Sequence, residues 1–303
     1  MRRISLVLAI LACVLSACDP TAKQPTRQST KIENIAPYSN PALNQIVNDQ
    51  QIKFMIGTGP VNYSNQIMML SSLGVPDQAT VDKFIPMLVK ELSLYPPGTL
   101  KKMGIDTLVL TQRANVAIKS GETFLQPQPR TAVPLFTERA VTLDVGLSHK
   151  GQEFLASIIH HEFFHQADYV ADLTVQKDPN WENLNYQGFS YGSGGQGKRW
   201  MGVATWDDAL QGILNEYSQT ALEEDKAEIF AALMWAPEDL RRRAKTDSAL
   251  ANKGRSIISF LNGLDPQFNA DFFATISAKR AAFAAPSTDY YIYTPYGYQE
   301  RRK

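Results

Sequence analysis

The sequence is poor in cysteine, with two in 303 residues, Cys13 and Cys18. Both lie ahead of residue 20, so no disulfide can brace the rest of the chain. There is also no excess of charge, since 30 basic residues balance 30 acidic ones and no long block of one sign occurs. The lack of a basic surface speaks against nucleic acid as a partner. Because 44% of the residues are hydrophobic, the chain has enough apolar surface for a large core.

The one long apolar run lies at the start, over residues 4–14, and it is too short to cross a bilayer as a helix. It follows two arginines and leads through small residues to Cys18, an arrangement that resembles the lipobox of bacterial lipoproteins. We therefore predict a signal peptide over 1–17, a lipid on Cys18 that contacts a membrane of the cell envelope, and a flexible tether over 18–40. An ordinary cleaved secretory signal is the alternative.

Secondary-structure patterns divide the remaining chain, 41–303, into two halves. Apolar spacing predicts a helix over Thr80–Leu94, although Pro86 should kink it or shift its start. Residues 106–111 and 139–144 favour strands, the second alternating as a half-buried strand would. Beyond residue 150 the patterns predict helices over 152–168, 222–235, 237–245 and 248–261. The prediction is an α+β domain with a small sheet and a mainly helical C-terminal half.

Histidine is scarce as well, with four in the chain, but all four fall between positions 149 and 165. Within this span, His161-Glu162-Phe163-Phe164-His165 has the HExxH pattern in a predicted helix. Two histidines four residues apart lie on one helix face, so both imidazoles can bind one zinc ion. Glu162 is offset around the helix and suits the base that acts on a metal-activated water. His160 points to another face and is expected to be a packing or hydrogen-bonding residue rather than a metal ligand.

A catalytic zinc site needs a third protein ligand, and the best source is the segment Leu222–Ala231. On a helix, Glu224 and Glu228 share a face, so one carboxylate can bind zinc while the other holds the distal N–H of a histidine ligand. The residues alone leave open which of the two carboxylates binds zinc and which one holds the histidine. Acidic residues on a helix are also commonly a solvated face.

The HExxH segment continued to Asp168, followed by Tyr217 and by Glu224 to Glu228, resembles the lethal-factor-like gluzincins and the bacterial zinc-binding metallopeptidases related to them. The resemblance implies a zincin-like domain with an HExxH active-site helix and zinc as cofactor. It implies that Glu224 is the third ligand, that Glu228 supports a histidine ligand, and that Tyr217 donates its phenol to the oxyanion. Asp168 matches an acidic position of the family and, like Glu228, would support a metal ligand. A buried tyrosine and a helix-end aspartate are the plainer alternatives for Tyr217 and Asp168.

We therefore expect a zinc metallopeptidase that hydrolyses peptide or protein substrates with Glu162 as the general base. The alternative is a non-catalytic envelope lipoprotein that keeps the zinc fold as a binding module. Residues 192–198, at the end of the glycine-rich stretch 188–197, match most of a phosphate-binding loop. However, Arg199 stands where a hydroxyl should contact Mg²⁺, so no nucleotide is expected. The tyrosine-rich tail from Tyr290 is expected to pack back as an edge strand or to contact a partner.

Overall fold

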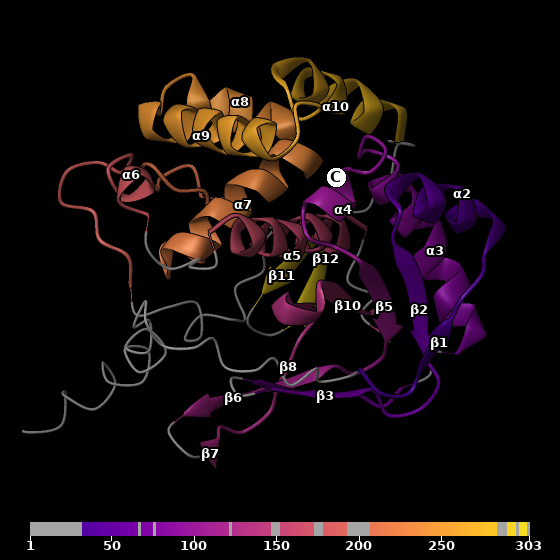
Figure 1. The fold of residues 1–303 in the computed structure, drawn as a ribbon. Coiled ribbons are helices and arrows are strands. Elements are labelled where there is room, and N and C mark those ends of the chain that lie inside the picture. Colours follow the sequence, from indigo (N-terminus) through magenta and orange to yellow (C-terminus); the bar gives the residue numbers. More distant parts are fainter. Residues whose placement is uncertain are drawn as a thin grey trace, which may run out of the picture.

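The computed structural model describes residues 32–65, 68–74, 77–120, 123–146, 152–172, 178–192, 207–283, 290–294 and 297–301. Two small sheets and a few helices make up the first half, and helices dominate from residue 152 onward (Figure 1). The mixed α+β architecture predicted from the sequence is therefore present. The predicted signal peptide, Cys18 and residues 193–197 of the glycine-rich stretch lie outside the described residues.

The first sheet has the strand order β1-β2-β5-β10-β9. Its three central strands are parallel, and both edge strands run antiparallel to their neighbours. The bounds are β1 Ile35–Pro37, β2 Lys53–Gly57, β5 Thr107–Thr111, β10 Ala140–Asp144 and β9 Ala132–Leu135. All five residues of β10 are buried, so the half-buried strand predicted there is wrong. Helices cover one face of this strand and the second sheet covers the other, which leaves no solvated side.

The second sheet is antiparallel and is built from β3 Asn62–Ser64, β4 Met68–Ser71, β6 Asn115–Ser120, β7 Thr123–Phe124 and β8 Gln128–Pro129. Its buried side chains, among them Tyr63, Leu70 and Val116, pack against Val109 and Leu135 of the first sheet. At the far end of the chain, β11 Tyr290–Thr294 pairs with β12 Gly297–Arg301. Among the described residues these two strands form a sheet of their own, so the tail does not extend either larger sheet as an edge strand.

The helices are α2 Pro41–Gln50, α3 Gln78–Leu92, α4 Thr99–Lys102, α5 Gln152–Asp172, α6 Pro179–Glu182, α7 Leu222–Trp235, α8 Pro237–Ala244, α9 Ser248–Leu264 and α10 Ala270–Phe283, with a 3₁₀ turn, η1, over Phe136–Glu138. The predicted helices are all present, and α7 has the predicted bounds. Helix α3 starts two residues before Thr80, where the Asp77 side chain accepts a hydrogen bond from the Thr80 N–H. It then continues through the exposed Pro86.

Helix α5 lies between the first sheet and the C-terminal helices, in contact with β9 below and α7 above (Figure 1). Three acidic residues occupy the first turn of α7, where the helix dipole favours negative charge. Helix α7 ends at Trp235, and Pro237 is the first residue of α8. This stacking brings the HExxH segment beneath the start of α7. The arrangement of α5 and α7 therefore positions the candidate site.

The packed domain begins before residue 41, so the tether predicted over 18–40 is wrong for residues 32–40. Ile35–Pro37 forms β1, which pairs with β2, and Ile32 is buried against the second sheet. Residues 32–40 thus belong to the packed domain, because their apolar side chains complete an edge of the first sheet. Among the helices of the described residues, none has both the length and the apolar character needed to cross a membrane.

Candidate metal centre

Helix α5 presents two imidazoles to the same point. His161 and His165 lie one turn apart, and their Nε2 atoms approach to 2.9 Å with the rings edge to face. Both side chains are largely buried between α5 and α7. The helical spacing that the sequence predicted therefore produces a pair of converging nitrogen donors.

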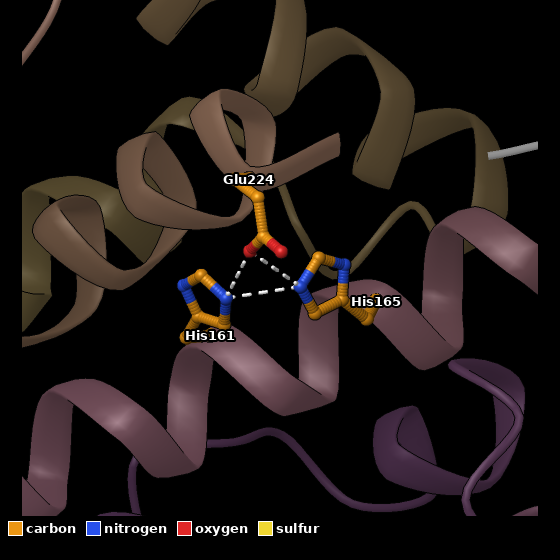
Figure 2. Close-up of side chains that lie close together, drawn as sticks. All are labelled: His161, His165 and Glu224. Atoms are coloured by element: carbon orange, nitrogen blue, oxygen red, sulfur yellow. Dashed lines mark hydrogen bonds and ion pairs between the residues drawn. The ribbon is translucent and has the colours of Figure 1, made fainter. Parts of the chain in front are cut away.

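Glu224, in the first turn of α7, completes the cluster from above (Figure 2). Its Oε2 atom lies 3.0 Å from Nε2 of His161 and 3.2 Å from Nε2 of His165. Within the described part of the chain, these three residues are the group whose donor atoms could hold a metal ion. The ligand set proposed from the sequence is thus brought together in space.

The donor set fits zinc in type and in spacing. Nitrogen and carboxylate oxygen are common zinc ligands, and tetrahedral bonds of about 2.0–2.1 Å place neighbouring ligand atoms about 3.3 Å apart. The donor atoms here are 2.9 to 3.2 Å apart, so a small outward shift would admit the ion. Two histidines and one carboxylate also leave a fourth position free, as in catalytic rather than structural zinc sites.

The electrostatic environment of the cluster stabilises positive charge at its centre. Burial lowers the pKa of His161, but the carboxylates of Glu224 and Glu228, 3.0 and 2.8 Å from its two ring nitrogens, outweigh burial and raise that pKa well above its ordinary value. Burial raises the pKa of Glu224, yet the two imidazoles hold it well below the usual range. A divalent cation in place of the imidazole protons would meet the same ionised carboxylates.

Glu228 lies one turn after Glu224 and contacts the far side of the His161 ring. Its Oε1 atom is 2.8 Å from Nδ1 of His161, while Oε2 accepts a hydrogen bond of 2.8 Å from the Asn215 amide. A carboxylate in this position fixes the ring orientation and the tautomer of a metal-binding histidine. This is the contact that a supporting role for Glu228 requires.

Glu162 and Tyr217 lie beside the cluster without belonging to it. Burial raises the pKa of the Glu162 carboxyl, against the lowering effect of His161 and His165. Burial and the nearby carboxylates of Glu224 and Glu162 raise the pKa of Tyr217 well above its ordinary value, so its phenol keeps its proton. The Tyr217 ring lies 5.9 Å from that of His161, centroid to centroid. Both residues therefore lie close enough to the cluster to interact with its charges.

Asp168 differs from the role suggested by the resemblance. Its contacts run to Lys226, whose Nζ atom is 3.3 Å from Oδ1 of Asp168 and 2.9 Å from Oδ2 of Asp178. Burial raises the pKa of Asp168, and the Lys226 charge opposes this rise. Asp168 thus joins α5 to α7 through an ion pair, rather than bonding an imidazole of the cluster.

His160 is a hydrogen-bonding residue, as the sequence predicted. Its Nδ1 atom lies 2.6 Å from the Tyr95 hydroxyl, and its Nε2 atom lies 2.8 Å from Oε2 of Glu91. Arg280 of α10 pairs with the same glutamate. Burial would raise the pKa of Glu91, but His160 and Arg280 hold it at about 2. This network anchors α5 through a face other than the one that carries the cluster.

Two supporting interactions were not predicted from the sequence. One is the contact of Asn215 with Glu228. The other is a buried ion pair of 2.6 Å between Asp225 and Lys253, in which Asp225 also accepts hydrogen bonds from Trp181 and Tyr191. Each joins segments that lie apart in the sequence, so no local pattern could have indicated it.

Comparisons with known proteins find one distant structural likeness. No family model matches the chain, and a search of curated proteins finds no match either. One solved structure, a "putative zinc-binding metallo-peptidase" from Bacteroides caccae, has a TM-score of 0.45 and 16% sequence identity, covering 78% of this chain and 88% of that one. A likeness this distant does not indicate a function for this chain.

Proposed function

We propose that this chain is a zinc-dependent peptidase of the HExxH gluzincin type, with a zincin-like domain. The observation that carries the proposal is the convergence of His161, His165 and Glu224, which come from two helices and whose donor atoms are spaced for one ion. A structural zinc site more commonly uses cysteine, and this site has none. The HExxH spacing also supplies a carboxylate, Glu162, that stays outside the ligand set.

The proposed mechanism assigns one task to each residue around the cluster. His161, His165 and Glu224 would hold the zinc ion, which supplies a water of lowered pKa and polarises the substrate carbonyl. Glu162 takes the proton of the attacking water and returns it to the leaving amine. Its raised pKa brings it closer to the range in which a carboxylate exchanges protons at neutral pH. Tyr217, kept protonated, donates a hydrogen bond to the developing oxyanion.

In the cell, we propose that the domain stands outside the cytoplasm on a lipid anchor at Cys18. The support for this part is the signal-like start of the sequence and the small residues ahead of that cysteine. Peptides or proteins of the envelope would then be its substrates, with neither nucleic acid nor nucleotide as a partner.

Metal removal provides the first test. The purified chain loaded with zinc is expected to cut unfolded casein, whereas a chelator should stop cleavage and added zinc should restore it, because the activated water depends on the ion. Fragments are followed by mass spectrometry, and zinc content by elemental analysis. A chain that holds one zinc ion and leaves casein intact would instead favour a non-catalytic binding module.

Removal of the carboxylate behind His161 provides the second test. Glu228→Ala is expected to weaken zinc binding by about ten- to a hundredfold, because the imidazole loses the partner that orients it. Competition with a chromogenic chelator measures the affinity. The exposed Glu182 on α6 offers a matched control, and Glu182→Ala should bind zinc as the unchanged chain does. Equal affinities for all three chains would remove the supporting role of Glu228.

A further inference from the structure

Asn215 lies between two parts of the candidate site and is bonded to both. The residue is buried, with 2% of its surface exposed. Its Nδ2 atom donates a hydrogen bond of 2.8 Å to Oε2 of Glu228. Its Oδ1 atom accepts two hydrogen bonds from Ser218, one of 2.8 Å from the backbone N–H and one of 3.0 Å from the hydroxyl. The amide therefore uses its donor end and its acceptor end on different partners.

Each partner leads to a residue with a proposed task. On the donor side, the other oxygen of Glu228 contacts Nδ1 of His161. On the acceptor side, the turn closed by Asn215 and Ser218 contains Tyr217. The Tyr217 carbonyl is held in turn by the backbone N–H and the hydroxyl of Thr220, at 3.0 and 2.6 Å. The backbone of Tyr217 is thus fixed on both sides.

We propose that Asn215 is a positioning residue that sets the orientation of His161 and the placement of Tyr217 together. The inference rests on the proposed function, since it gives these two residues the tasks of metal ligand and oxyanion donor. One buried amide would hold Glu228 against the imidazole and, through the turn, hold the phenol beside the same ring. The metal-binding and oxyanion-binding halves of the site are then coupled by one side chain.

Few side chains can make this pair of contacts. A side-chain amide has both a donor NH₂ group and an acceptor oxygen, whereas an ionised carboxylate of the same shape has acceptors alone. In a buried setting, an oxygen atom left without a donor is costly, so the direction of the hydrogen bond to Oε2 of Glu228 matters for stability and for geometry. Asn215→Asp therefore separates the two contacts, because it keeps the acceptor for Ser218 and loses the donor to Glu228.

The first arm of the test measures zinc affinity by competition with a chromogenic chelator, without reference to peptidase activity. Asn215→Asp is expected to bind zinc about ten- to a hundredfold more weakly, because Glu228 then faces a carboxylate and no longer orients His161. Thermal unfolding of the metal-free chain, followed by circular dichroism, shows whether the variant is folded. An affinity equal to that of the unchanged chain would overturn the inference.

The second arm is a rescue that a merely structural role would not produce. Adding Glu228→Gln restores a donor and an acceptor between the two positions, with the direction of the hydrogen bond reversed. The double variant should therefore bind zinc more tightly than Asn215→Asp alone. If the costs of the two substitutions simply add, the positions are not coupled and the inference is overturned.

The third arm concerns the turn. Ser218→Ala removes one of the two hydrogen bonds to Asn215 and leaves the contact with Glu228, so zinc affinity should be unchanged while kcat falls by up to about tenfold with little change in KM. An unchanged kcat would overturn the part that concerns Tyr217. If the unchanged chain cleaves no peptide at all, the proposed function fails, yet the zinc measurements on Asn215 and Glu228 still decide the coupling.

Discussion

Glu162→Gln is expected to bind zinc as tightly as the unchanged chain and to cleave peptides about 10²–10⁴-fold more slowly, the usual contribution of a general acid–base residue. The side chain keeps its size but no longer accepts a proton from the attacking water. Because Glu162 is not among the residues whose donor atoms converge, the metal site should survive the change. Zinc content and the initial rate on a fluorogenic peptide, measured on one preparation, check both halves of this result.

A matched control is Glu182→Gln, which makes the same chemical change at an exposed position on α6. It should leave the rate and the zinc content as they are. Turnover of Glu162→Gln at the rate of the unchanged chain would remove the assignment of the base, and loss of zinc from this variant would place Glu162 in the ligand set instead.

Glu224→Ala should lose zinc more severely than any variant of the supporting residues. Two imidazoles would remain, but the carboxylate that lies within 3.2 Å of both Nε2 atoms would be gone. We expect the affinity to fall by more than the roughly ten- to hundredfold loss predicted for Glu228→Ala, since a ligand rather than its support is removed. Chelator competition measures the difference, and cleavage should fail along with zinc binding.

The neighbouring residue makes an unusually close control for this experiment. Glu223 occupies the same first turn of α7, and burial raises the pKa of its carboxyl too, but its oxygens are not part of the donor cluster. Glu223→Ala should therefore keep its zinc. Equal losses in Glu223→Ala and Glu224→Ala would contradict the assignment of the third ligand.

The parts of this site that follow helix periodicity could be predicted from the sequence. His161 and His165 are four residues apart on one helix, so their convergence depends on local geometry alone. The bounds of α7 were equally clear, because acidic residues mark its start and Pro237 its end. Which carboxylate of α7 meets the histidines depends on how two helices pack. The residues alone left Glu224 and Glu228 open, and the resemblance to a known family selected Glu224.

Other features could not be predicted because they depend on contacts between distant segments. The amide of Asn215 donates a hydrogen bond to Glu228. Lys226 of α7 forms an ion pair with Asp168 of α5. Strand β10 has an alternating pattern, yet both of its faces are covered, since a second sheet packs where solvent was expected. Helix α10 is not predicted from the sequence, because its many alanines weaken the contrast between an apolar and a polar face.

The wide separation of the donors along the chain has a consequence for how the protein acquires its ion. Glu224 lies 63 positions from His161 and 59 from His165, so the complete chelating set exists only after α5 and α7 have docked. An ion that binds the native state and not the unfolded chain adds its binding free energy to the stability of the fold. Under the proposed function, a shortage of zinc would therefore make the protein more susceptible to proteolysis and would also stop its proposed activity.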